Sequence, residues 1–132
     1  MRNYRIKELK EQLFLVLGLG NLLVNPNETA SYRRGIRVGR GHACMVALPR
    51  TLLQLWKTLE ICINLDKIII LQAANTGLTG GSTPSGDDYD RDVVIINTVA
   101  INQLFLINNG LQVIALPGTT LYHLEESLAV FD

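Results

Sequence analysis

Apolar residues recur along this chain with two different spacings, and the alternation between them predicts a mixture of helices and strands. Between residues 51 and 63 they recur every three or four positions, which is the spacing of one helix face. Thr51 is a suitable N-cap for this helix, with Gln54 at the capping-box position. We expect Trp56 to point at least partly inward, because it lies on the apolar face.

Shorter, continuous apolar runs predict strands that are covered on both sides. Such runs lie at residues 43–49, 67–72 and 92–97, and the last two should be neighbouring strands joined by the intervening loop. Two further runs flank an Asn-Asn-Gly turn within residues 104–116 and predict a hairpin, and a last helix is expected over residues 120–131. The order of elements predicts a single α+β domain rather than an uninterrupted βαβ series.

Residues 1–24 begin with a basic stretch followed by an apolar run, as a secretory leader does. Two glutamates interrupt the basic stretch, however, and the apolar run is too short to span a bilayer. We therefore expect an amphipathic helix that ends near Gly18 or Gly20, and then a loop at residues 25–28.

Composition narrows the range of functions. The 132 residues carry 12 basic and 12 acidic side chains, so no net field favours nucleic acid. Cys44 and Cys62 lie in apolar surroundings, which is typical of buried thiols in a reducing compartment and favours a cytoplasmic location. His42 and His123 have no second ligand at metal-binding spacing, so we predict no metal site.

The loop between residues 72 and 92 is the region where chemistry is expected. Its glycines leave main-chain N–H groups open to an anion, and short polar side chains add further donors, as in phosphate sites. The glycines are Gly77, Gly80, Gly81 and Gly86, and the polar residues are Asn75, Thr76, Thr79, Ser82 and Thr83. A Gly-Lys-Ser/Thr ending and a GxGxxG-helix unit are both lacking, which disfavours ATP hydrolysis and Rossmann-type NAD binding. The alternative is a solvated connection without a ligand.

The order of residues in this loop, "QAANTGLTGGSTP" followed by "DYDRDVVIIN", resembles the flavin loop of the respiratory, quinone-dependent D-lactate dehydrogenases. These enzymes belong to the group with a vanillyl-alcohol-oxidase or p-cresol-methylhydroxylase (PCMH) type FAD-binding domain. Residues 25–72 and 115–128 resemble the flanking segments of the family. The resemblance implies the first half of such a domain, with a helix and loop over 1–24 and an α+β core over 43–132, and without the second flavin-binding piece and the substrate domain.

The same resemblance implies FAD as the cofactor and a set of contacts with its diphosphate. These contacts would come from Ala73, Ala74, Asn75, Thr76, Gly77, Gly81 and Ser82. A full-length enzyme of the family passes electrons from D-lactate through FAD to a membrane quinone and yields pyruvate. The resemblance therefore also implies peripheral association with the cytoplasmic face of the inner membrane.

No catalytic residue is assigned within the chain. Arg33, Arg34, Arg37 and Arg40 are expected in a solvated loop, and Asp87, Asp88, Asp90 and Asp92 at turns and strand edges, with Arg91 as an ion-pair partner. A half-domain should expose apolar surface and self-associate. Two other interpretations stay open: a small non-catalytic binding or interaction domain from a truncated gene, and a fragment of another FAD-dependent 2-hydroxy-acid or alcohol oxidase.

Overall fold

A four-stranded sheet forms the centre of the computed structural model, which describes residues 2–87 and 89–131. The strands lie in the order β1 (Leu22–Leu23), β2 (Met45–Ala47), β4 (Val93–Asn97) and β3 (Ile68–Gln72). β1 is antiparallel to β2, whereas β2 and β3 are both parallel to β4. The predicted neighbouring strands around the glycine-rich loop are therefore confirmed.

Burial differs sharply between these two neighbours. Every residue of β4 is buried, because β4 is a central strand with both faces covered. β3 is an edge strand, and its Leu71 is 56% exposed. The expectation that β3 is covered on both sides is wrong, since a continuous apolar run does not reveal whether a strand is central or at the edge.

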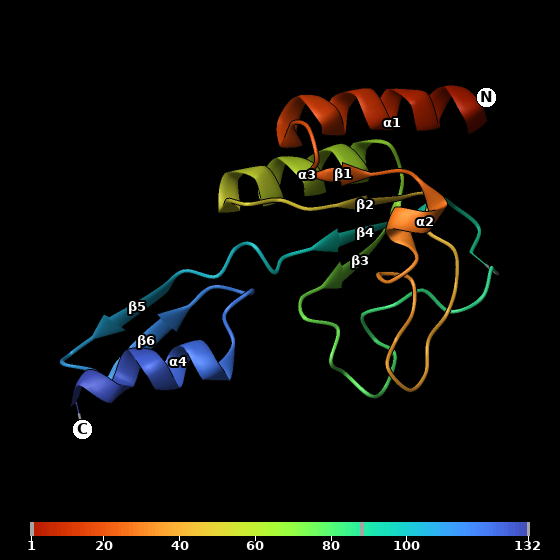
Figure 1. Ribbon diagram of the computed structural model, residues 1–132. Coiled ribbons are helices and arrows are strands. Elements are labelled where there is room, and N and C mark those ends of the chain that lie inside the picture. Colours follow the sequence, from red (N-terminus) through yellow and green to blue (C-terminus); the bar gives the residue numbers. More distant parts are fainter. Residues whose placement is uncertain (1, 88, 132) are drawn as a thin grey trace.

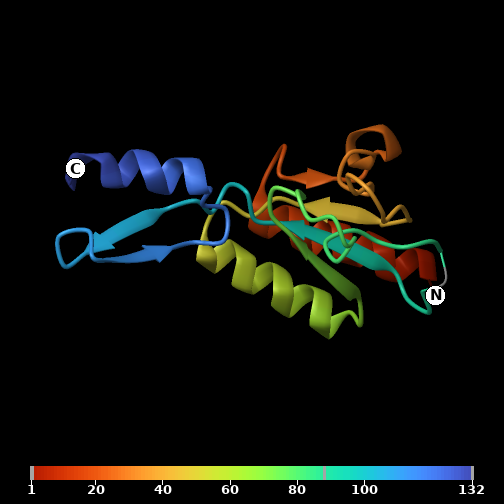
Figure 2. The same ribbon diagram turned by 90° about the horizontal axis from the view of Figure 1, so that it is seen from below.

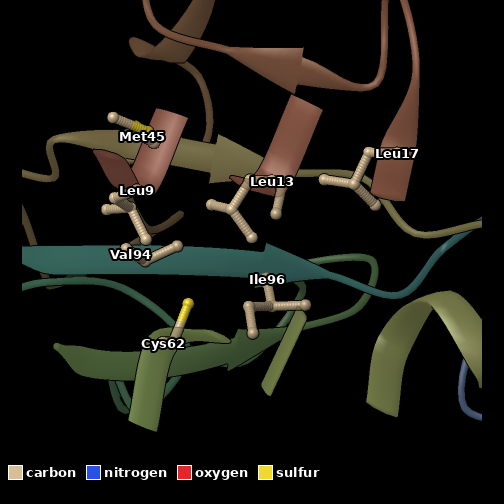
Figure 3. Packing of buried hydrophobic residues seen from close by; sticks show 8 residues of the cluster. Leu9, Leu13, Leu17, Met45, Cys62, Val94 and Ile96 are labelled. Carbon is tan, nitrogen blue, oxygen red and sulfur yellow. The ribbon is translucent and has the colours of Figure 1, made fainter. Parts of the chain in front are cut away.

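One face of the sheet is covered by two helices, α1 (Arg2–Leu17) and α3 (Leu52–Asn64), which lie side by side (Figure 1). The helices and the sheet bury a common cluster that includes Leu9, Leu13, Met45, Val94 and Ile96 (Figure 3). This is the larger of the two buried hydrophobic clusters in the part of the chain that the structure describes, and its burial stabilises the fold.

The helix ends follow the sequence signals. α1 stops before Gly18, which takes φ +77° and donates its N–H to Phe14 O over 2.9 Å, as predicted. The Thr51 side chain caps α3 by accepting the N–H of Gln54 over 3.1 Å. Trp56 is 59% exposed, so the indole is only partly inward.

The opposite face of the sheet is covered mainly by irregular segments. Tyr32 and Tyr89 from two loops pack against a second cluster that includes Val46, Val93 and Ile95. The loop predicted at residues 25–28 is instead a one-turn helix, α2 (Pro26–Thr29). Asn25 caps it and Pro26 occupies its first turn, where a missing N–H costs nothing.

A hairpin and the last helix form a separate projection from the sheet (Figures 1 and 2). It comprises β5 (Leu104–Ile107), β6 (Gln112–Ala115), α4 (Leu121–Leu128) and the short 3₁₀ helix η1 (Ala129–Phe131). Asn108 and Asn109 adopt φ of 52° and 54° in the turn, which confirms the hairpin signal. We name residues 102–131 the hairpin unit and residues 4–101 the sheet unit. None of the described helices is both long and apolar enough to cross a membrane.

Candidate functional site

A groove of about 490 Å³ opens at the carboxyl ends of β3 and β4. Its lining residues lie within three segments, 31–36, 72–75 and 97–99. Ligands of sheets with parallel strands bind at this end, because the loops that follow the strands meet there. The glycine-rich loop, residues 73–86, therefore leaves the sheet at the place where a ligand is expected.

A network of buried amides holds the start of this loop. The two N–H bonds of Gln72 Nε2 reach Tyr32 O at 2.9 Å and Ser82 O at 2.8 Å. Asn97 Nδ2 donates to Gln72 Oε1 over 3.1 Å and to Ala73 O over 2.9 Å. Because every one of these donors is used, the amides position the loop rather than bind a ligand.

Asn75 joins the glycine-rich loop to the facing segment. Its φ is +55°, its Nδ2 donates to Arg34 O over 2.9 Å, and its Oδ1 accepts Ser82 Oγ–H over 2.9 Å. Asn tolerates this left-handed conformation better than other non-glycine residues. These side-chain groups of Asn75 and Ser82, expected to contact a ligand, are engaged with the protein itself.

Main-chain N–H groups are what the loop leaves open. In the part of the chain that the structure describes, no hydrogen bond uses a main-chain N–H of Ala74–Ser82 as its donor. Such a run of free N–H groups is the chemistry of an anion-binding concavity. The donor set is neutral, so it suits an anion whose charge is spread over several oxygens.

The glycines of the loop fall into two groups. A Cβ built on Gly77 or Gly81 meets nothing within 4 Å, so open space lies beside the backbone there. Gly80 has φ +76°, and a Cβ on it would lie 3.2 Å from Val38 Cγ2, whereas a Cβ on Gly39 would clash with Thr83 Oγ1. Gly80 and Gly39 thus let the two loops pack closely, while Gly77 and Gly81 leave room for a ligand.

The structure brings together part of the predicted set. Ala73, Ala74 and Asn75 line the groove, whereas Thr76, Gly77, Gly81 and Ser82 lie further along the loop and do not line it. Sequence reasoning missed several groove residues, namely Ser31, Tyr32, Arg34, Gly35, Ile36, Gln72, Asn97 and Val99. A polar residue that ends an apolar strand, as Gln72 and Asn97 do, was a usable signal.

Asp90 and Asp92 have structural partners. Asp92 directly precedes β4, in keeping with the strand-edge position expected, and its Oδ2 forms a buried ion pair with Lys67 Nζ at 2.9 Å. The predicted role of Arg91 is confirmed, since it pairs with Asp66 and Asp90, and these carboxylates raise its pKa. The expectation for Asp88 lies outside the described residues. In the described residues, no group of three or more His, Cys, Asp and Glu side chains is arranged to hold a metal ion.

The two thiols lie close to the helix-covered core. Burial, reinforced by the neighbouring Cys44, raises the pKa of the Cys62 thiol to about 12. Cys62 is therefore a neutral hydrophobe at physiological pH and not a nucleophile.

Comparison with solved structures places this fold in a class. No family model matches the chain. The structure of p-cresol methylhydroxylase with substrate bound superposes with a TM-score of 0.77 at 16% identity, covering 97% of this chain and 25% of that one. Alkyldihydroxyacetonephosphate synthase gives a TM-score of 0.82 at 14% identity, covering 95% of this chain and 25% of that chain. The chain thus has the α+β fold of part of a PCMH-type protein, which confirms the predicted fold class.

Curated sequences give a more particular likeness. The chain is 52% identical over 122 residues to the quinone-dependent D-lactate dehydrogenase of Escherichia coli (strain K12), covering 92% of this chain and 21% of that protein. The enzyme of the same name from Haemophilus influenzae is 49% identical over 126 residues, covering 96% of this chain and 22% of that protein. The resemblance to quinone-dependent D-lactate dehydrogenases is therefore confirmed, and the chain spans about a fifth of their length.

Proposed function

We propose that this chain is the FAD-binding part of a quinone-dependent D-lactate dehydrogenase. The observation that carries the proposal is the run of free main-chain N–H groups over Ala74–Ser82, which begins in the groove at Ala74 and Asn75 and continues along the glycine-rich loop. Identity of 49–52% to two enzymes of that name supports the same assignment.

The residues present fit a flavin diphosphate. Its charge needs several short hydrogen bonds, and the N–H groups of the glycine-rich loop offer them without a competing partner. Gly77 and Gly81 leave space where phosphate oxygens would approach the backbone. Ala74, Asn75, Thr76 and Ser82 would then contribute main-chain N–H contacts, and Ala73, which lines the groove, would lie beside them.

The geometry changes the roles proposed for two side chains. Because Asn75 and Ser82 hydrogen-bond to each other, and Asn75 also to Arg34 O, they hold the loop in the shape that presents its N–H groups. They act as positioning residues, and the main chain binds the anion. When bound, the flavin supplies the acceptor for the electrons removed from a 2-hydroxy acid.

The reaction that we propose for the whole protein is the oxidation of D-lactate to pyruvate, with electrons passed through FAD to quinone. This chemistry needs a cation for the substrate carboxylate and a base for the hydroxyl proton. We assign neither to this chain, so the chain alone should bind FAD without turnover. We propose peripheral attachment to the inner membrane, because a quinone acceptor is dissolved in the membrane, and a location on its cytoplasmic face, because the two cysteine thiols suit a reducing compartment.

The domain assignment is part of the same proposal. Residues 1–132 would form the N-terminal part of the FAD-binding domain, and a second flavin-binding piece and a substrate domain would complete the enzyme. Both solved structures reported above are about four times longer than the part matched here, since this chain covers 25% of each.

A direct test is a titration of the chain with FAD, followed by the main-chain amide resonances in a ¹⁵N correlation spectrum. We expect the largest shifts over Ala74–Ser82 and in the facing segment 31–36. AMP and riboflavin, which each lack the diphosphate, serve as controls and should shift the Ala74–Ser82 resonances less. Shifts elsewhere, or none at high FAD concentration, would contradict the proposal.

Self-association is a further expected property of the chain alone. All four residues of β6 are exposed, and large apolar side chains of the hairpin unit face solvent, including Phe105, Val113, Ile114, Leu121 and Tyr122. Exposed apolar surface of this kind drives association. Light scattering should show a mass that rises with concentration, and a stable monomer at all concentrations would count against a missing flavin piece.

A further inference from the structure

A second polar cleft lies next to the groove, and three of its lining residues are arginines. The cleft has a volume of about 320 Å³ and is lined by Ala30, Ser31, Arg33, Arg34, Arg40 and Gly41. We name it the arginine cleft. It shares Ser31 and Arg34 with the groove, so the two sites lie side by side.

The backbone brings two of these arginines opposite each other. Arg34 and Arg40 form an antiparallel β-bridge, flanked by hydrogen bonds from Gly35 N to Gly39 O at 2.8 Å and from Gly41 N to Arg33 O at 3.3 Å. Residues directly opposite in such a bridge point to the same face, and like charges at these positions destabilise the pair. Arg34 and Arg40 are both exposed, so solvent screens much of this repulsion, and an anion between the side chains would relieve the rest.

Arg33 adds a third guanidinium that is partly withdrawn from water. Its Nη2 donates to Pro26 O over 3.1 Å, while its Nε is buried and has no hydrogen-bond partner among the described residues. This half-buried position differs from the solvated loop expected from the sequence. None of the three cleft arginines forms an ion pair with a carboxylate in the part of the chain that the structure describes.

We infer that the arginine cleft is a binding site for a multiply charged oxyanion, such as the phosphate of a phosphate monoester. A dianion can neutralise two of the three guanidinium charges and accept hydrogen bonds from all three groups. The planar N–H forks of arginine also suit phosphate oxygens. A monocarboxylate would neutralise only one of the three charges. The arginine cleft adjoins the proposed flavin site and shares Ser31 and Arg34 with its groove, but it differs in chemistry, because it offers charged side chains where the glycine-rich loop offers neutral N–H groups.

The test uses inorganic phosphate as the probe and the arginine Nε–Hε resonances of the 132-residue chain as the readout. Phosphate should shift the resonances of Arg33, Arg34 and Arg40 with one common dissociation constant. Acetate at the same ionic strength should bind at least about tenfold more weakly, because it carries one charge. Equal affinity for the two anions would overturn the assignment to a dianion.

Two variants with the same change of charge locate the site. Arg40→Gln should weaken phosphate binding at least about tenfold, because it removes a charge-assisted hydrogen bond. It should also leave the melting temperature in chloride unchanged or higher, because it removes the repulsion with Arg34. Arg37→Gln is the matched control, since Arg37 is exposed on the same loop and does not line the cleft. Equal effects of the two variants on phosphate affinity would contradict the inference.

A third variant separates this site from the proposed flavin site. Gly81→Val alters the glycine-rich loop, where open space lies beside the backbone, and leaves the arginine cleft intact. Phosphate binding by the cleft should therefore be unchanged in Gly81→Val. If this variant weakens phosphate binding as much as Arg40→Gln does, the anion lies on the glycine-rich loop and the inference is wrong.

Discussion

The sheet unit and the hairpin unit are built from equally apolar strands, yet they differ in what covers those strands. All five positions of β4 are buried between α1, α3 and the loops of the opposite face. All four positions of β6 are exposed, and α4 has no buried residue in the described part of the chain. A two-stranded hairpin is only marginally stable in water without further strands or helices.

The difference teaches that an apolar pattern predicts a strand but does not predict whether other elements bury that strand. Ile95 in β4 and Ile114 in β6 occupy similar sequence contexts, while their exposed fractions are 0% and 52%. The sheet unit should therefore carry the global stability of the chain. The hairpin unit leaves much of its apolar surface exposed to solvent.

The largest expected effect comes from the buried ion pair of the sheet unit. Lys67 and Asp92 have side-chain exposures of 4% and 8%. Lys67→Met removes a positively charged partner of the buried Asp92 carboxylate and should lower the free energy of unfolding by about 3–5 kcal/mol. Arg91→Met is the control, because the Arg91–Asp66 pair is solvent-exposed and its loss should change stability far less. Urea unfolding that gives equal losses for both variants would contradict the burial of the pair.

Two substitutions that shorten an isoleucine side chain to alanine, one in each unit, compare the two units directly. Ile95→Ala should cost about 2–5 kcal/mol, because it opens a cavity in a closely packed core. Ile114→Ala should change the free energy of unfolding by less than about 0.5 kcal/mol, because the side chain is half exposed in the hairpin unit. Both are measured by urea unfolding at low protein concentration, where association is weakest. Similar costs at the two positions would show that the hairpin unit has a core of its own.

The smallest expected effects come from two helix caps with the same geometry. Thr51 accepts the N–H of Gln54 in the sheet unit, and Thr120 accepts the N–H of His123 in the hairpin unit, each over 3.1 Å. Thr51→Ala should lower global stability by about 1 kcal/mol. Thr120→Ala should reduce the helicity of α4 in circular dichroism while leaving the urea midpoint in place. A shift of the midpoint in Thr120→Ala as large as that in Thr51→Ala would mean that the two units unfold together.

Local signals in the sequence predicted most of the elements. The cap at Thr51, the stop at Gly18 and the Asn-Asn-Gly turn depend on neighbouring residues, and the structure confirms each of them. Burial of β3 was mispredicted because its position at the sheet edge depends on strand order, which no local pattern encodes.

The sequence could predict where the candidate loop lies but not the contacts that hold it. Glycine spacing indicated an anion-binding loop, whereas the hydrogen bond from Gln72 to Tyr32 O joins residues 40 positions apart and leaves no local signal. The hydrogen bond from Asn75 to Arg34 O leaves no local signal either, because folding alone brings the segment of Arg34 close to Asn75. Contacts between distant segments therefore decide which polar groups are left free for a ligand.

The central claim is that the free main chain of the glycine-rich loop binds the diphosphate of FAD, and two adjacent glycines test it most directly. Gly81→Val should lower the affinity for FAD at least about tenfold while stability changes by less than about 0.5 kcal/mol, since a Cβ there meets only open space. Gly80→Val should instead destabilise the fold, because the φ of Gly80 is +76° and an added Cβ would lie only 3.2 Å from Val38 Cγ2. FAD binding by flavin fluorescence and stability by thermal melting should separate the two variants in this way. Undiminished FAD binding by Gly81→Val, or a loss of binding only in step with a loss of folding, would contradict the account.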